Sequence, residues 1–131
     1  MTRRQARELA LQTLFSIEIG KHEPSAALEE GLKAPSAAEQ REFVSDLVLG
    51  TIEHASDTDA VIAPLLVGWT LDRLPTIDRL ILRMAIYEMR YQPETPRAVV
   101  MNEAIELAKK YSTEDSGRFV NGVLSSASKV A

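Results

Sequence analysis

The sequence predicts an all-α fold, a single domain of about seven helices packed around a central apolar helix. Apolar residues recur at helical spacing along almost the whole chain, and no segment shows the alternation that is typical of a strand. No internal repeat, low-complexity tract or long linker divides the 131 residues, an ordinary length for one domain with its own core. The third observation is one segment, residues 76–90, that is apolar on nearly every side.

That segment reads TIDRLILRMAIYEMR, and its apolar residues cover well over half of a helical wheel. A helix with this pattern has to be surrounded by other elements, so we expect it to be the central helix. Pro75 and Thr76 mark its start, with Thr76 expected as the N-cap. Asp78 falls in the first turn, where the helix dipole favours an anion.

The other helices follow from apolar spacing and from capping residues. Residues 2–19 should form a helix that begins with a Thr2/Gln5 capping box and stops at Gly20. Ser25 is expected to cap a short helix, and Ser36 and Glu39 to form a second capping box. The remaining expected elements are listed here with their bounds: residues 25–33, 36–55, a helix capped by Asp57 or Asp59 that runs through Leu66, a short turn of helix at 70–74, then 97–111 and 116–129.

Three residues in these helices invite structural expectations. Trp69 stands beside an aliphatic cluster and is expected to pack against it. Gly117 and Gly122 lie inside the last helix at a cost of about 1 kcal/mol each relative to alanine, which suggests the close approach of another backbone or of a ligand.

The composition excludes several classes of chemistry. The chain has no cysteine, which excludes thiol catalysis, disulfides and cysteine-based zinc sites, and it contains no phosphate-binding loop or hydrolase motif. His22 and His54 are expected on the surface, and Glu88 at least partly buried and paired. No second acid, nucleophile or metal ligand is visible near Glu88, so we expect no catalytic residue, metal or cofactor. Without a transmembrane run or signal segment, the expectation is a soluble cytoplasmic protein with no membrane contact.

A cluster of arginines at the start of the chain is the first candidate site. The formal net charge is -4, so any binding of nucleic acid must depend on a local basic patch. Arg3, Arg4 and Arg7 share one side of the first helix, where positive charge opposes the helix dipole. We interpret them as a phosphate-binding patch, against the alternative of a solvated helix end. Leu11 and Phe15 continue down the same side as an apolar extension.

Further basic residues near the end of the chain extend this hypothesis. Lys109, Lys110 and Arg118 could join the patch, with Phe119 as a stacking group. Cations on phosphates and planar groups against splayed bases are the means by which single-stranded RNA is bound. The alternative is a helical protein–protein interaction module without nucleic-acid binding, in which the cations are solvated and Phe119 is core.

Three segments resemble a known family: RRQARELALQTLF at the start, DRLILRMAIYEMR in the centre, and NEAIELAKKYSTEDSGRFVNGVL over residues 102–124. They are similar to the NusB family of bacterial transcription antitermination factors, and the match runs in order through the whole chain. The resemblance implies two small helical bundles and identifies residues 1–131 as a NusB-like RNA-binding domain.

The resemblance also implies a function. It is the binding of the boxA element of nascent RNA, mainly in ribosomal RNA leaders, together with NusE, a small-subunit ribosomal protein. The pair then helps to load further Nus factors onto RNA polymerase, which becomes resistant to termination. No catalysis or cofactor belongs to this function.

Family positions can be carried over residue by residue. The residues that the resemblance links to RNA are Arg3, Arg4, Arg7, Asp115, Arg118 and Phe119, and those that it links to the ribosomal protein are Phe15 and Asp78. An acidic surface that faces a basic partner would account for the negative net charge.

The chain departs from the family pattern in its short arginine cluster, which has Gln5 where some relatives have another arginine. Fewer phosphate contacts imply weaker RNA binding and a shallower salt dependence. Family members also differ in oligomeric state, and a homodimer could cover the arginines until RNA or the partner displaces it.

Overall fold

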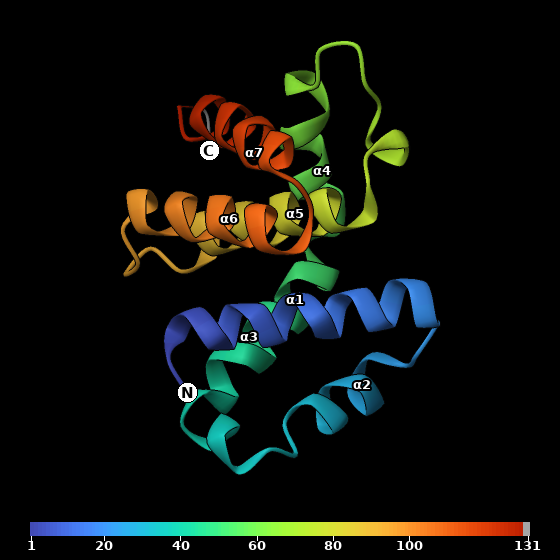
Figure 1. Cartoon of the computed structure of the whole chain (residues 1–131), viewed down its shortest axis with the longest axis vertical. Coiled ribbons are helices and arrows are strands. Elements are labelled where there is room, and N and C mark those ends of the chain that lie inside the picture. The colour runs from blue at the N-terminus through green and yellow to red at the C-terminus, as the bar shows by residue number, and fades with distance from the viewer. Residues whose placement is uncertain (130–131) are drawn as a thin grey trace. The chain divides into compact units, whose positions relative to one another are not determined.

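The computed structural model describes residues 1–129, and over this range it contains only helices and the turns that join them (Figure 1). The α-helices are α1 (Arg3–Gly20), α2 (Pro24–Gly31), α3 (Arg41–Glu53), α4 (Ala55–Ile62), α5 (Thr76–Tyr91), α6 (Arg97–Tyr111) and α7 (Glu114–Ala127). Three short 3₁₀ helices accompany them: η1 (Pro35–Gln40), η2 (Ala63–Leu65) and η3 (Leu71–Arg73). The predicted all-α class is confirmed. The chain forms two compact units, Met1–Glu53 and His54–Ala131.

In the first unit, α1 packs against α2 and α3. The α1 residues Ala6, Ala10 and Leu14 recur at helical spacing and are buried. Leu11 is also buried, so the expectation that it extends the arginine patch as an apolar surface is wrong.

The start of α1 has the predicted capping box. The Thr2 hydroxyl accepts a hydrogen bond from the Gln5 amide at 3.1 Å, and the Gln5 side chain accepts one from the Thr2 amide at 2.9 Å. These bonds satisfy two amide groups that a helix start otherwise leaves without partners. At the other end the left-handed residue is Lys21, with φ 56°, and Gly20 is still helical. A Cβ at Gly20 would lie 2.6 Å from the ring of His22, so that exposed side chain would have to move if Gly20 were replaced.

The predicted caps of the next two helices are wrong. Glu23, not Ser25, caps α2 by accepting a hydrogen bond from the Ala26 amide at 3.0 Å. Hydrogen bonds from the Ser25 and Ala26 amides lower the pKa of Glu23. The segment predicted as a helix from Ser36 begins as η1, and α3 starts only at Arg41. Glu39 does not close a capping box, and its carboxylate lies 3.6 Å from the N-terminal amine.

In the second unit, α5 packs against α4, α6 and α7 (Figure 1). Its buried residues fall on all sides of the helix: Asp78, Leu80, Ile81, Leu82, Met84, Ala85, Ile86, Tyr87, Glu88 and Met89. Each fully buried leucine or isoleucine contributes about 1.5–3 kcal/mol relative to exposure. Within this unit, α5 is therefore the central apolar helix that the sequence predicted. Glu88 is 1% exposed, so its expected burial is confirmed.

The starts of α5 and α7 differ from prediction by small shifts. Pro75 occupies the N-cap position of α5, and Thr76 is the first helical residue, so the predicted Thr76 cap is wrong. The last helix begins two residues earlier than expected, because the Thr113 hydroxyl caps α7 by accepting from the Ser116 amide at 3.0 Å.

The two aspartates expected to cap α4 lie inside that helix, which begins directly after His54. Asp59 accepts two hydrogen bonds from the Arg83 guanidinium of α5, at 2.7 and 2.8 Å. Asp57 accepts one from the Tyr91 hydroxyl at 2.8 Å, and the His54 ring stacks on Tyr91 with their centres 4.1 Å apart. These acids therefore join α4 to α5 instead of capping α4.

Trp69 is not packed as expected but is 56% exposed. The loop around it is held at its two ends, where Leu66 and Leu74 are buried, while Val67 and the left-handed Gly68 (φ 78°) are exposed. The chain turns outward between the two buried leucines, and this carries Trp69 to the surface.

The two glycines of α7 have different surroundings. A Cβ on Gly117 would lie 2.9 Å from Cγ of Lys109, so a side chain of α6 makes the close approach, and not a backbone. At Gly122 an added Cβ would meet nothing within 4 Å. Across residues 1–129, none of the helices combines the length and the apolar character needed to cross a membrane.

Candidate nucleic-acid interface

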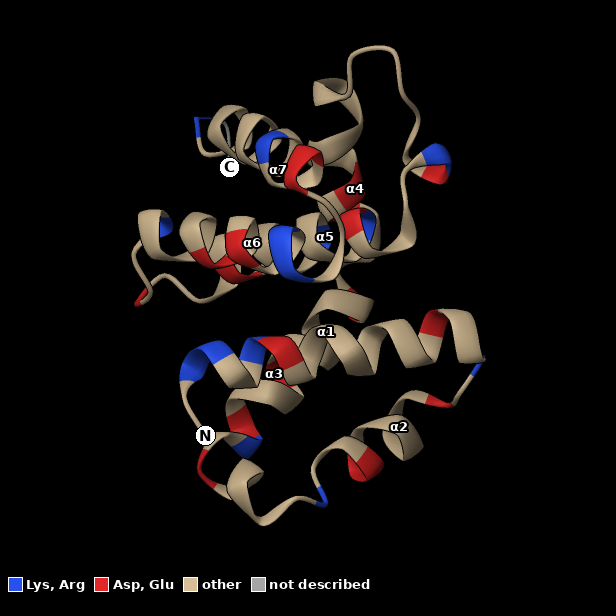
Figure 2. Cartoon of the chain, in the orientation of Figure 1, with Lys and Arg blue, Asp and Glu red and all other residues tan. Residues whose placement is uncertain are grey.

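The arginines of α1 lie beside the aromatic ring of Phe43 in α3. Basic residues gather at the start of α1 (Figure 2). The Arg3 guanidinium carbon lies 4.0 Å from the centre of the Phe43 ring in α3, and that of Arg7 lies 5.3 Å from the same centre. Such cation–π contacts contribute about 0.5–1 kcal/mol each at exposed sites. Phe43 therefore positions two of the three predicted RNA-binding arginines.

The three arginines differ in exposure. Arg3 and Arg4 are exposed, whereas Arg7 is only 5% exposed. A buried guanidinium cannot present its full hydrogen-bonding edge to a phosphate. Arg3 and Arg4 thus form the accessible part of the basic patch, and Arg7 supports it from below.

Phe15, the predicted partner residue on α1, is 36% exposed. Ile19 lies one turn further along the helix and is also exposed. The two side chains form an exposed apolar strip on α1, of which the sequence had identified only the first member.

The second unit holds a pocket of about 230 Å³ at the first turns of α5 and α7. Its lining residues are Trp69, Leu74, Pro75, Asp78, Asp115, Ser116 and Phe119. The resemblance assigned Asp78 to the partner and Asp115 and Phe119 to RNA, yet these three residues line one pocket. Sequence reasoning missed Trp69, and the only signal for it was a lone tryptophan between two turn residues, Gly68 and Thr70.

Asp78 has an unusual hydrogen-bonding environment. The side chain is 4% exposed, and its Oδ2 accepts a hydrogen bond from the Ser116 hydroxyl at 2.8 Å. Its Oδ1 is buried, and within the described part of the chain it has no hydrogen-bond partner. Leaving a buried acceptor without a donor costs about 1–3 kcal/mol, more when the group is charged. This oxygen is itself buried, so the pocket presents almost none of it to a bound group.

Basic side chains lie around the first turns of α7. Arg118 donates to Oδ1 of Asp115, and both side chains are largely exposed. Lys109 covers Gly117, and its Nζ lies 3.9 Å from Glu106. Lys110 lies over the Tyr111 ring at 5.4 Å. Arg118 and Lys109 are thus each paired with a carboxylate inside the second unit. That they join the arginines of α1 in one basic patch stays a prediction.

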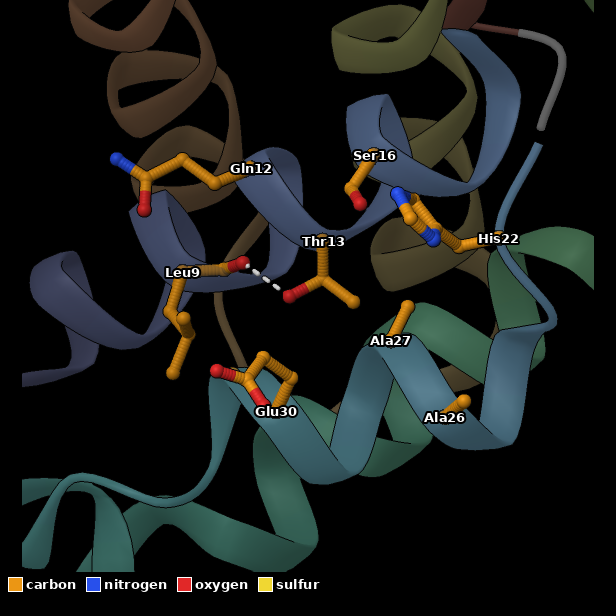
Figure 3. Close-up of a pocket in the computed structure, with 9 residues that line it drawn as sticks. Leu9, Gln12, Thr13, Ser16, His22, Ala26, Ala27 and Glu30 are labelled. Carbon is orange, nitrogen blue, oxygen red and sulfur yellow. Dashed lines mark hydrogen bonds between the residues drawn. The ribbon is translucent and has the colours of Figure 1, made fainter. Parts of the chain in front are cut away.

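A larger pocket in the first unit, about 460 Å³ between α1 and α2, contains none of the predicted site residues (Figure 3). Its lining is Leu9, Gln12, Thr13, Ser16, His22, Ala26, Ala27, Glu30 and Gly31. The Thr13 hydroxyl in it donates to the Leu9 carbonyl of its own helix at 2.8 Å. Among residues 1–129, no group of three or more His, Cys, Asp or Glu side chains is arranged to hold a metal ion.

Taken with the fold, these sites define a small all-helical binding protein with a basic helix start and an acidic, aromatic pocket. The chain belongs to the NusB family, whose defining sequence pattern matches residues 4–129. Transcription antitermination protein NusB of Desulforamulus reducens is 48% identical over 125 residues, which cover 95% of this chain and 87% of the relative.

Solved structures agree with this assignment. A structure of NusB from T. maritima is 36% identical, has a TM-score of 0.89, and is matched over 99% of this chain and 92% of its own. A chain in a crystal structure of the antitermination factors NusB and NusE in complex with double-stranded RNA is 28% identical, with a TM-score of 0.85 and complete coverage of both chains. The predicted family and fold are therefore confirmed.

Proposed function

We propose that this chain is a transcription antitermination factor that binds boxA RNA of ribosomal RNA leader transcripts together with NusE. With further Nus factors it helps RNA polymerase to resist termination. The observation that supports this most strongly is the match of residues 4–129 to a family whose members carry that name. In this proposal the protein acts in the cytoplasm by binding, without catalysis and without a cofactor.

The residues that contact RNA are Arg3, Arg4 and Arg7 in the first unit and Asp115, Arg118 and Phe119 in the second. Arg3 and Arg4 are exposed and offer charge-assisted hydrogen bonds to phosphates. Phe119 lines the pocket in the second unit and offers a face for a base. Asp115 holds the Arg118 guanidinium through their ion pair, which orients it at the start of α7.

The ribosomal protein contacts the first unit through the exposed strip of Phe15 and Ile19. The formal charge of -4 suits a basic partner. Asp78, the second residue that the resemblance links to the partner, is buried, so a partner could reach it only with a group that enters the pocket.

The test is binding of labelled boxA RNA to the chain, with and without NusE, against a scrambled RNA of equal length. We expect tighter binding of boxA than of the scrambled RNA, and a further gain when NusE is present. Equal affinity for both RNAs in the presence of NusE would contradict the proposal.

A salt titration separates this function from a protein–protein module without RNA binding. Phosphate contacts release counterions, so the logarithm of the affinity falls linearly with the logarithm of salt concentration, by about 0.7 per contact for a single strand. A flat dependence would favour the protein–protein module.

A further inference from the structure

We propose that Asp78 is a positioning residue for RNA binding: through a hydrogen bond to Ser116 it fixes the start of α7, where three of the residues proposed to contact RNA lie. This inference rests on the proposed RNA-binding function. It gives Asp78 a role inside the second unit, in place of the contact with the protein partner that the resemblance implied.

The carboxylate of Asp78 is too enclosed for direct contact with a partner. The side chain is 4% exposed, and its Oδ1 is itself buried. Its Oδ2 accepts a hydrogen bond from the Ser116 hydroxyl at 2.8 Å, across 38 positions of the chain. Neither oxygen is therefore open to a group from outside the molecule. The carboxylate instead joins the first turn of α5 to the first turn of α7.

The Ser116 hydroxyl is the centre of a group of three hydroxyls at the start of α7. Its single proton is donated to Asp78, so its oxygen can only accept in its other contacts. The Thr113 hydroxyl donates to it at 3.1 Å, and the Ser112 oxygen lies 2.9 Å away, which makes Ser112 the donor in that pair. The Asp78 carboxylate thus sets the direction of the other hydrogen bonds in the group.

These hydroxyls also hold the backbone of the turn. The Thr113 oxygen caps α7 by accepting a hydrogen bond from the Ser116 amide at 3.0 Å. The first amides of a helix have no partner within it, so such a cap is what keeps the first turn formed. Gly117 follows in the same turn, and glycine lowers helix stability through its backbone freedom. The start of α7 therefore depends on the group that Asp78 orients.

The same part of α7 carries the side chains proposed to contact RNA. Asp115 comes directly before Ser116, and Arg118 and Phe119 follow it within one helical turn. The ion pair of Asp115 with Arg118 is largely exposed, and exposed pairs hold side chains only weakly. The positions of these side chains therefore follow from the backbone of α7. A loosened first turn would have to be ordered when RNA binds, which lowers affinity.

The test measures two affinities for each variant: for boxA RNA with NusE in excess, and for NusE without RNA. Asp78→Asn leaves only a neutral amide beside the hydroxyls, and Ser116→Ala removes the central hydroxyl. We expect each change to weaken RNA binding about fivefold, through the cost of ordering the turn, and to leave the affinity for NusE unchanged. Thermal unfolding shows whether each variant is folded in the assay, and Ser116→Ala carries the test if Asp78→Asn does not fold.

Glu114→Gln is the matched control for charge. Glu114 is an exposed acid in the first turn of α7, and its replacement removes the same charge as Asp78→Asn. RNA binding should not weaken in this control.

Two double variants separate positioning from a general loss of stability. Combined with Arg118→Ala, the effect of Asp78→Asn on RNA affinity should shrink, because one side chain that it positions is gone. Combined with Arg4→Ala, in the first unit, the effect should stay about fivefold, since distant and independent sites are additive.

Several outcomes would overturn the inference. Unchanged RNA affinity with weaker NusE binding would make Asp78 a partner contact. Losses of both affinities in proportion to lost stability would leave Asp78 with a role in the fold alone. Equal effects beside Arg118→Ala and Arg4→Ala would show that Asp78 does not act through α7. If the wild-type chain does not bind boxA RNA even with NusE, the proposed function itself fails, and this is seen before any variant is measured.

Discussion

Replacing Phe43 by leucine should leave the arginines of the basic patch less firmly positioned, while an apolar side chain still fills the space beside them. The ring of Phe43 lies under two guanidinium groups, at 4.0 Å for Arg3 and 5.3 Å for Arg7. Leucine keeps an apolar side chain at this half-buried position but removes the π face. Two cation–π contacts of about 0.5–1 kcal/mol each are lost, so their loss should lower the free energy of unfolding by at most roughly 1–2 kcal/mol.

In this variant the free energy of RNA binding should fall by less than the free energy of unfolding. Arg3 keeps its charge, so the number of phosphate contacts and hence the salt slope should stay nearly constant. The arginine must, however, be ordered on binding, which costs about 0.5–1.5 kcal/mol for a long side chain and lowers RNA affinity by roughly two- to thirteenfold.

The assay combines urea unfolding with RNA binding at several salt concentrations. Phe15→Leu on α1 serves as the control, because the ring that Arg3 and Arg7 contact belongs to Phe43 and not to Phe15. Wild-type stability and wild-type RNA affinity in Phe43→Leu would refute the view that this ring positions the arginines. A changed salt slope would show instead that a phosphate contact has been lost.

Three further predictions follow from the same structure. Arg4→Ala, at an exposed position, should weaken boxA binding and reduce the salt slope by about 0.7, with melting temperature little changed; an unaltered slope would exclude a phosphate contact. Tyr91→Phe should remove the hydrogen bond that is the main cause of the lowered pKa of Asp57. Because that pKa is lowered, the stabilisation is fully present above the ordinary aspartate pKa and is lost as pH falls through the lowered value, so wild type and variant should converge in stability in acid. The Tyr91 pKa is raised by the same bond, so at alkaline pH its contribution is lost as pH rises through the raised value, and the stability curves measured by urea unfolding from acid to alkaline pH should also converge there. Gly122→Ala should stabilise the chain by up to about 1 kcal/mol, since the added methyl group meets nothing within 4 Å in α7; a lower midpoint of thermal unfolding would reveal a contact at this surface.

Local patterns predicted those features that depend on one helix alone. The capping box of Thr2 and Gln5 forms as expected, because both partners lie within the same first turn. Residues 97–111 form α6 with the predicted bounds, between a proline-containing loop and a turn. The capping box expected at Ser36 and Glu39 does not form, because the 3₁₀ helix there begins at Pro35 with Ala34 at the cap position, and the N-terminal amine, distant in sequence, lies 3.6 Å from the Glu39 carboxylate.

The candidate site was only partly predictable for the same reason. The arginines were visible in the sequence, but their support by Phe43 joins residues about forty positions apart. Asp78 and Ser116 are similarly separated, and their hydrogen bond brings the starts of α5 and α7 together around the pocket. No spacing rule along the chain reports such a contact.

The sequence by itself determined the all-α class, the buried central helix of the second unit and membership of the NusB family, because helical periodicity and family motifs are written in neighbouring residues. Only the tertiary structure decided that Trp69 is exposed beside Asp78 and Phe119, and that one oxygen of Asp78 lacks a donor. Burial and hydrogen-bond satisfaction depend on which helices pack together, and that packing is a sum of contacts between residues far apart in the chain.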